Sequence, residues 1–306
     1  MQDFYIPYEK RKPDFQYRRA LKNILPPHGE YVKNPFQDTG TYSCFTLPPL
    51  IFDLSNGIPL ITERKIGFWR MFISEVIAFL NGARTLKELR QYGNEKTWPK
   101  FWEKWWTPEK CAEFGLAQGD GGPGGYGPTL HDWPTAYGNQ FNQIEAVLDQ
   151  ARDFPGLRTH MFTTWRPDMA LRSRQGMRQV VVAPCHGTLV KLIIIDGKLT
   201  VEHVQRSCDM PLGGVGNIFQ WSAFTLMVAQ VLDLVPHRYI HYFMDAQIYE
   251  DQVQWVKKLV RRRPRPFPTL RIIDNGITSI FDFREHHFEL TDYHPHPAMG
   301  DIPATE

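Results

Sequence analysis

Two runs of strand-forming residues that meet at a turn dipeptide constrain the fold more than any other feature of the sequence. Residues 188–195 (TLVKLIII) and 198–205 (KLTVEHVQ) are rich in apolar and β-branched side chains, and Asp196-Gly197 separates them. An Asp-Gly dipeptide between two such runs is typical of a tight β-hairpin. We therefore predict an antiparallel strand pair here, preceded by a further short strand at residues 179–184 (QVVVAP).

Helical patterns occur on both sides of this hairpin. Apolar residues recur at helical spacing from Gly67 to Leu80, and Asn81-Gly82 follows as a C-cap would. Further helices are predicted at residues 15–24, 141–152, 217–233 and 248–263. Asn56-Gly57, between the apolar runs 50–54 and 59–62, predicts a second hairpin or a tight strand connection. Without an internal repeat or a clear linker, residues 1–306 are predicted to form a single α+β domain.

Composition excludes several classes of protein. The formal charge of +2 comes from 35 basic and 33 acidic residues, a balance too even to indicate a nucleic-acid or membrane partner. The N-terminus lacks an apolar signal region, and no stretch reaches the roughly 18 apolar residues of a membrane helix. The four cysteines share no short repeated spacing, which fits a reducing compartment. We expect a cytoplasmic protein.

Two segments have no regular pattern. Residues 1–35 are polar and proline-punctuated, and we interpret them as a peripheral N-terminal arm. Residues 96–138 combine five tryptophans with the glycine-rich run GDGGPGGYG at 119–127. A linker is usually poor in tryptophan, so an ordered functional loop is favoured. The glycines match neither a Walker A loop nor a dinucleotide-binding fingerprint.

Cys185 is the first candidate for chemistry. It stands in Ala-Pro-Cys-His directly after the apolar residues 180–182, where a scaffold can present a thiol to a cleft. A lone cysteine is also often a small buried hydrophobe, and its position alone leaves both interpretations open. A zinc site is disfavoured, because adjacent Cys-His ligands suit tetrahedral coordination poorly; the side chains for it would be Cys185, His186, His203 and Cys208.

Two charged residues are placed to act with this thiol. The hairpin would return Arg206 toward Cys185, where a guanidinium favours the thiolate and can bind a phosphate; a surface ion pair with Asp209 is the alternative. Glu75 lies in the middle of the 67–80 helix, where apolar neighbours would raise its pKa and suit it to proton transfer. Its alternative is a glutamate at the edge of the apolar stripe that reaches solvent.

Taken together, six motifs resemble the thymidylate synthase family in order and spacing, from about Asp38 to the last residues. The family has a single α+β domain, with a mixed β-sheet covered by helices, and it dimerises by stacking sheets back to back. The resemblance therefore implies a homodimer. The motifs are Ala183-Pro184-Cys185-His186, Gln205-Arg206-Ser207-Cys208-Asp209, Asn217-Ile218, Asp245-Ala246-Gln247-Ile248-Tyr249, Arg263-Pro264-Arg265-Pro266-Phe267-Pro268 and Tyr293-His294-Pro295-His296-Pro297.

The resemblance implies transfer of a one-carbon unit from 5,10-methylenetetrahydrofolate to C5 of dUMP, without a metal. Cys185 would add to C6 of the pyrimidine, and Glu75 would manage protons at the C4 carbonyl. Asn217 would read O4 and N3 of uracil, since related cytidylate hydroxymethylases carry aspartate there.

Further roles also come from the resemblance. Arg206 matches a phosphate-binding arginine, and Arg158 matches one supplied by the partner subunit. Tyr126 and Asp209 match catalytic positions, and Asp209 also matches the pterin-binding aspartate. The remaining substrate positions are Gln205, Ser207, Gln247, Tyr249 and His186, and the remaining folate positions are Trp98, Trp102 and Gly213.

This chain departs from the family pattern at the phosphate site. Asp38 and Thr159 stand where the family has arginines, so two of the four usual phosphate cations are missing. Gln247 replaces a histidine, and Gly214-Val215-Gly216 replaces bulkier residues. The candidates to substitute for the missing cations are Lys33, Arg64, His131 and Arg166.

The tail and the basic residues leave alternatives open. The chain ends in residues 301–306 (DIPATE), where the family has a short apolar segment that closes over the ligands. Poor closure would let water, in place of hydride, complete the reaction, so a hydroxymethylase is the alternative function. An inactive nucleotide- or RNA-binding relative is a remote one, motivated by the missing arginines and the basic residues 257–265, which can also simply oppose a helix dipole.

Overall fold

A five-stranded mixed sheet forms the centre of the structure, a computed structural model that describes residues 4–34, 37–93, 102–174, 176, 178–300 and 302–304. The strand order is β3-β10-β8-β7-β6, and only the β8–β10 pair is parallel within it. The predicted hairpin is confirmed as β7–β8, with Asp196 and Gly197 at positive φ in the turn. The strands are β3 Leu50–Asp53, β6 Met161–Phe162, β7 Leu189–Ile195, β8 Lys198–Gln205 and β10 Val235–Phe243.

A second sheet lies beside the end of β8 and carries several candidate residues. Its order is β1-β2-β11-β9, and β9 follows β8 within three residues. The parallel β11–β9 pair places Gln247 opposite Asp209. The strands are β1 Glu30–Val32, β2 Thr41–Cys44, β9 Cys208–Asp209 and β11 Ala246–Tyr249, and two further pairs join β12 Thr269–Ile272 to β13 Phe288–Thr291 and β4 Trp133–Pro134 to β5 Gln140–Phe141.

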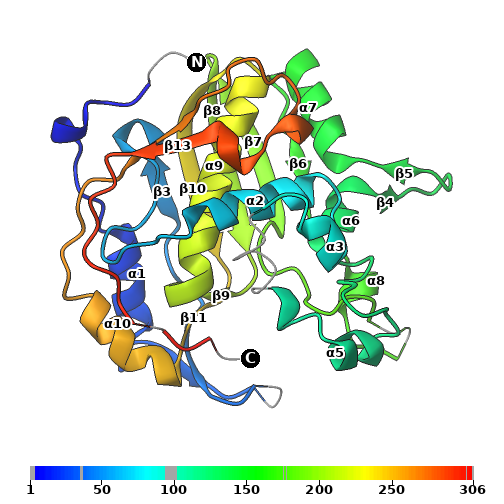
Figure 1. Cartoon of the computed structure of the whole chain (residues 1–306), viewed down its shortest axis with the longest axis horizontal. Coiled ribbons are helices and arrows are strands. Elements are labelled where there is room, and N and C mark those ends of the chain that lie inside the picture. The colour runs from blue at the N-terminus through cyan, green and yellow to red at the C-terminus, as the bar shows by residue number, and fades with distance from the viewer. Residues whose placement is uncertain are drawn as a thin grey trace.

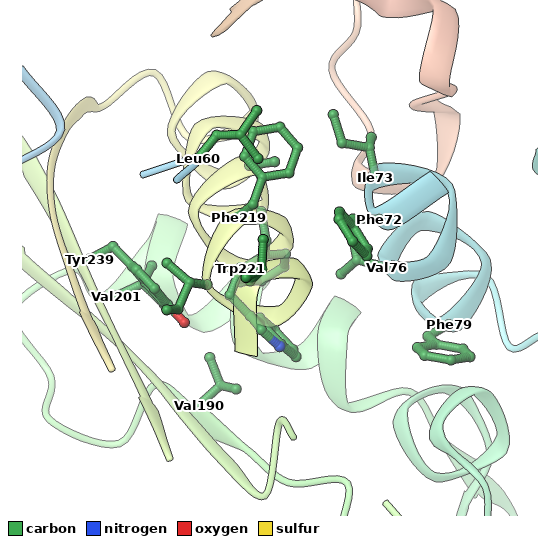
Figure 2. Close-up of a cluster of buried hydrophobic side chains, with 14 of the residues drawn as sticks. Leu60, Phe72, Ile73, Val76, Phe79, Val190, Val201, Phe219, Trp221 and Tyr239 are labelled. Atoms are coloured by element: carbon green, nitrogen blue, oxygen red, sulfur yellow. The ribbon is translucent and has the colours of Figure 1, made fainter. Parts of the chain in front are cut away.

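The core lies between the five-stranded sheet and two helices. Helix α9, Val215–Val231, is buried over most of its length and packs on β8 and β10, and α2, Trp69–Leu80, packs against its other side (Figures 1 and 2). The other helices are α1 Gln16–Ile24, α3 Leu86–Leu89, α5 Pro108–Glu113, α6 Tyr126–His131, α7 Gln143–Asp153, α8 Pro167–Ala170 and α10 Val253–Leu259. Single turns occur at η1 Tyr8–Lys10, η2 Leu54–Asn56, η3 Met210–Gly214, η4 Glu250–Gln252, η5 Ile280–Asp282 and η6 Glu285–His287.

The α+β class and the helices α2, α7 and α9 are as predicted, but three local predictions are wrong. Residues 179–184 are not a strand, because they make only isolated backbone bonds, such as Val181 N–H to Gly121 O at 3.1 Å. Residues 59–62 form no hairpin with β3, which pairs with β10 instead. The 248–263 helix starts only at Val253, since residues 246–249 belong to β11.

Part of the predicted N-terminal arm belongs to the core. Helix α1 buries Tyr17, Leu21 and Ile24, and the Tyr17 hydroxyl donates to Met210 O at 2.9 Å. Its amphipathic face packs on β2 and β11, so this segment is not peripheral.

In the part of the chain that the structure describes, no helix is both long and apolar enough to cross a bilayer.

Candidate active site

Cys185 lies half-buried in the loop before β7, not at the end of a strand. Its carbonyl accepts from the backbone N–H of Arg206 at 2.8 Å, so the hairpin does return Arg206 to the thiol. The Tyr126 hydroxyl accepts from the Cys185 N–H at 2.8 Å and donates to Sγ at 3.4 Å. Burial raises the pKa of the Cys185 thiol, while the Tyr126 hydrogen bond and the Arg206 charge oppose that rise.

Two rings pack against Tyr126 and against each other. Phe79 stacks on Tyr126 with ring centroids 4.5 Å apart, His186 stacks on it at 4.4 Å, and the centroids of Phe79 and His186 are 6.2 Å apart. Trp221 Nε1 donates to His186 Nδ1 at 3.2 Å. Burial lowers the pKa of His186 to about 3, so the ring is neutral and its proton is assigned to Nε2.

Glu75 is buried within α2 and does not reach solvent. Its Oε1 accepts from Trp102 Nε1 at 3.0 Å, which places one of the predicted folate-loop tryptophans at the carboxyl. Burial raises the pKa of Glu75 to about 7, and the Trp102 hydrogen bond and the nearby Gln220 amide oppose that rise. A carboxyl with such a pKa suits proton transfer near neutral pH.

Gln220 is a residue that sequence reasoning missed. It is fully buried on α9, one turn after Asn217, and acts on the pKa of Glu75. Yet neither its amide nitrogen nor its amide oxygen has a hydrogen-bond partner at direct contact distance among the described residues. The i+3 spacing from Asn217 was the signal that could have identified it, because both side chains then lie on one face of α9.

Arg206 is positioned by an aromatic ring and two carbonyls. Its guanidinium lies over the Trp165 ring at 5.1 Å and donates to Pro184 O at 3.3 Å and Ala183 O at 3.4 Å. No pattern in the sequence pointed to Trp165. The alternative ion pair with Asp209 is absent, since Asp209 accepts from other donors.

Three of the four cations considered as substitutes at the phosphate site have other partners. Arg64 donates to Pro211 O at 2.7 Å, Arg166 pairs with Asp168, and His131 pairs with Asp132 at 3.1 Å. Lys33 is exposed just after β1.

Arg158 is exposed in the loop between α7 and β6, at the edge of the five-stranded sheet. Its side chain therefore lies on the surface of the chain.

Ser207 and Gln247 meet beside Arg206. Gln247 Nε2 donates to Ser207 Oγ at 3.2 Å and also to Asp245. Tyr249 follows on the same strand, and its hydroxyl accepts from Gln37 Nε2 at 2.8 Å. Burial raises the pKa of Tyr249 to about 12, so its hydroxyl stays protonated.

Asp209 connects the candidate folate site to the end of the chain. Its carboxyl accepts from Leu212 N–H at 3.2 Å and from Gln252 Nε2 at 3.0 Å, and burial raises its pKa to about 6. The same Gln252 nitrogen donates to Pro303 O at 2.9 Å, and Ile302 is buried. Gly213 lies in the following turn η3. Trp98 lies outside the described residues.

The glycine-rich run serves packing. A Cβ on Gly121 would lie 2.4 Å from Trp106, and Gly122 has φ of 93°. These glycines let the backbone pass close to the aromatic side chains that surround Tyr126.

Among the described residues, no three His, Cys, Asp or Glu side chains are grouped so that they could hold a metal ion.

Comparison with known proteins identifies the family. Residues 15–304 match the family described as thymidylate synthase. A curated protein named "Thymidylate synthase" from Human herpesvirus 8 type P (isolate GK18) is 32% identical over 298 residues, which covers 94% of this chain and 82% of the viral protein. The chain therefore belongs to the thymidylate synthase family.

Proposed function

We propose that the protein transfers a one-carbon unit from 5,10-methylenetetrahydrofolate to C5 of dUMP, giving dTMP and dihydrofolate. The observation that carries this proposal is the grouping of a nucleophile, a cation and a proton-transfer group. Cys185 hydrogen-bonds to Tyr126 and lies against the Arg206 backbone, and the charge of Glu75 acts on the pKa of both Cys185 and Tyr126.

Each residue has a defined task in this reaction. The Cys185 thiolate forms a bond to C6, and the electron pair of the C5–C6 double bond moves toward C5 and the C4 oxygen. Glu75, with a pKa of about 7, supplies or removes a proton at that oxygen as charge develops. The C5 carbon then forms a bond to the methylene carbon of the folate and loses its proton. The bond from that carbon to the folate nitrogen breaks, a hydride from the folate adds to the carbon, and departure of the thiolate from C6 restores the C5–C6 double bond, which leaves dTMP and dihydrofolate.

Nucleotide recognition would use the cluster at the ends of β8 and β9. Arg206, oriented by Trp165, would bind the phosphate together with the Ser207 hydroxyl. Asn217, in the first turn of α9, presents both an amide donor and an amide acceptor, as the O4 and N3–H edge of uracil requires.

The folate would supply the one-carbon unit and the hydride. Asp209 and Trp102 suit its binding, since a half-buried carboxyl can accept from pterin N–H groups and an indole can contact its ring. The seating of Ile302 and Pro303 beside Gln252 supports a tail that excludes water, and so favours hydride over water as the final reactant.

An assay with purified protein, dUMP and methylenetetrahydrofolate tests this function. Dihydrofolate appears as an absorbance change, and mass spectrometry of the nucleotide distinguishes a methyl from a hydroxymethyl product. Formation of 5-hydroxymethyl-dUMP without dihydrofolate would instead establish the hydroxymethylase alternative.

We also propose that the protein acts as a cytoplasmic homodimer. The sheet face opposite α9 exposes large apolar side chains on several strands: Ile51 48%, Met161 42% and Leu189 37%. Such a face is typical of an interface between subunits. Arg158, at the edge of this sheet, could then reach the partner's site. Light scattering of wild type and of Ile51→Glu tests the dimer, and the new charge should shift the measured mass toward that of the monomer.

All four cysteines are free thiols, which supports a reducing compartment such as the cytoplasm.

A further inference from the structure

A chain of hydrogen bonds crosses the core from the Cys185 loop to the end of β8. The Gly187 N–H donates to His203 Nε2 at 2.7 Å, and His203 Nδ1 lies 2.9 Å from the Tyr239 hydroxyl. That hydroxyl lies 2.9 Å from His241 Nδ1, and His241 Nε2 lies 3.0 Å from Gln205 Oε1. Gln205 Nε2 then donates to Ser207 O at 2.9 Å.

Only one arrangement of hydrogens satisfies every contact with neutral rings. A backbone N–H can only donate, so His203 Nε2 accepts and its Nδ1 carries the proton. Tyr239 therefore accepts from His203 and donates to His241 Nδ1, which leaves the His241 proton on Nε2. The Gln205 amide is fixed in turn, because its oxygen faces a donor and its nitrogen faces a carbonyl. Every bond runs in the same direction, from Gly187 to Ser207.

Burial keeps the two imidazoles neutral. His203, Tyr239 and His241 have no exposed surface, and Gln205 has almost none. Burial lowers the pKa of both histidines well below the ordinary value, and each lies near another imidazole that opposes its protonation further. Tyr239 lies on the sheet face that packs against α9, among apolar residues (Figure 2).

The two ends of this hydrogen-bond chain, Gly187 and Ser207, lie in the two halves of the candidate site. Gly187 is two residues after Cys185 and has φ of 63°. Ser207 follows Arg206, and the backbone N–H groups of both residues point to the Cys185 carbonyl. The hydrogen-bond chain therefore joins the nucleophile loop to the phosphate-binding segment through the interior, as a second connection besides these direct bonds.

We propose that His203, Tyr239 and His241 are positioning residues that hold the Cys185 loop and the Arg206–Ser207 segment in one fixed relation before the nucleotide binds. The roles of Arg206 and Ser207 rest on the function proposed above. Apolar side chains of similar size would fill the same space at no cost in desolvation, and replacing a buried polar network by them is often neutral or stabilising. A directional network instead fixes a single arrangement of its members.

The test separates positioning from stability with two variants and a control. Tyr239→Phe removes the central hydroxyl and leaves two imidazole nitrogens unpaired. The triple variant His203→Leu/Tyr239→Phe/His241→Leu removes the three central members of the network, and the Gly187 N–H and Gln205 Oε1 lose their partners. Tyr5→Phe, the control, removes a hydroxyl that donates to Leu270 O in β12, outside the site.

Four measurements are made on each protein: the melting temperature, the kinetics with dUMP and methylenetetrahydrofolate, the rate of Cys185 alkylation by iodoacetamide, and the dUMP concentration that protects Cys185. Mass spectrometry follows the Cys185 peptide. Nitrogen NMR of histidine-labelled wild type and Tyr239→Phe gives the protonation of each imidazole nitrogen.

We expect neutral rings with His203 protonated at Nδ1 and His241 at Nε2 in the wild type. Tyr239→Phe should melt earlier, because it leaves buried groups unpaired. The triple variant should regain part of that stability, because it removes the two unpaired imidazoles, and its kcat/KM and its protection by dUMP should stay about tenfold weaker than in wild type. Tyr5→Phe should match wild type in kinetics and protection.

A stable triple variant with wild-type kinetics and protection would overturn the proposal, and so would the opposite tautomers in the wild type. If the triple variant does not fold, Tyr239→Phe tests the proposal by itself. A wild-type rate of Cys185 alkylation, wild-type protection by dUMP and an unchanged His203 tautomer in Tyr239→Phe would then refute the positioning role. Failure of wild type to bind dUMP refutes the proposed function alone, since the tautomers and the Cys185 alkylation rate still test the positioning role.

Discussion

The hydroxyl of Tyr126 contacts Cys185 at two points, accepting from its backbone N–H at 2.8 Å and donating to its Sγ at 3.4 Å. A single oxygen thus orients the loop backbone and also stabilises a negative charge on sulfur. The second task matters because burial alone raises the pKa of this thiol.

Replacing Tyr126 by phenylalanine should therefore weaken the nucleophile. Tyr126→Phe keeps the ring but removes the donor to Sγ, so the pKa of Cys185 should rise further. The rate of Cys185 alkylation at pH 8 should fall about tenfold, as expected for losing one hydrogen bond to a charged group. Cys44, which is half-buried and distant from Tyr126 in sequence, is the internal control in the same sample. An unchanged alkylation rate at Cys185 would contradict the role given to the hydroxyl.

Neutralising Glu75 should make the protein more stable at alkaline pH. Burial raises the folded-state pKa from 4.5 to about 7, so the folded state holds this proton more tightly than the unfolded state does. The contribution of the protonated Glu75 carboxyl to folding stability is fully present below pH 4.5, and it is lost as the pH rises through about 7. Glu75→Gln removes this dependence and keeps an acceptor for Trp102.

Urea unfolding at pH 5 and pH 8 measures the effect. The free energy of unfolding of the variant should exceed that of wild type by up to about 3 kcal/mol at pH 8, and by much less at pH 5. Its turnover should be lost at both pH values. Parallel pH curves for the two proteins would show that Glu75 does not titrate in this range.

The stack between Arg206 and Trp165 predicts that lysine cannot replace the arginine. Arg206→Lys keeps the charge but loses the planar fork and most of the stacking on the indole. KM for dUMP should rise about tenfold or more, with a smaller change in kcat. Trp165→Leu should raise KM by a smaller factor, because the guanidinium remains. Equal KM values for wild type and Arg206→Lys would exclude Arg206 as the phosphate ligand.

The unpartnered amide of Gln220 predicts a trade between stability and activity. Gln220→Met keeps the side-chain length and removes a buried polar group, so the free energy of unfolding should rise by about 1 kcal/mol. The pKa of Glu75 should rise, because the amide now lowers it, and kcat at pH 7 should fall. Gln230→Met is the matched control on α9, since that amide donates to Asp274 O and Ile277 O and its loss should destabilise the protein. A lower melting temperature for Gln220→Met contradicts the prediction.

The sequence predicted features that depend on local patterns. Asp196-Gly197 determines the β7–β8 hairpin because both residues accept positive φ, and helical periodicity identifies α2 and places Glu75 on it. The apolar run 180–182 looks like a strand but has no neighbouring strand to pair with, which only the tertiary structure reveals.

Contacts between distant segments account for the rest. Trp102 reaches Glu75 across 27 residues, and Tyr126 reaches Cys185 across 59. The resemblance to the family placed these residues in one site, but it did not predict Trp165, Gln220 or the neutral histidines of β8 and β10. For Gln220 the i+3 spacing from Asn217 was the one available signal. Trp165 and His203 act through partners that are distant in sequence, so no spacing rule identifies them.

The ring stack of Phe79, Tyr126 and His186 has a consequence for the whole turnover cycle. In the proposed reaction, once Cys185 is bonded to carbon, its sulfur is a thioether and accepts hydrogen bonds only weakly. Tyr126 then loses a partner at the stage when the intermediate must persist. Because Phe79 and His186 both stack on the ring, the hydroxyl keeps its place while the sulfur is alkylated. The same geometry then awaits the departing thiolate, and the enzyme begins its next cycle without first rebuilding its site.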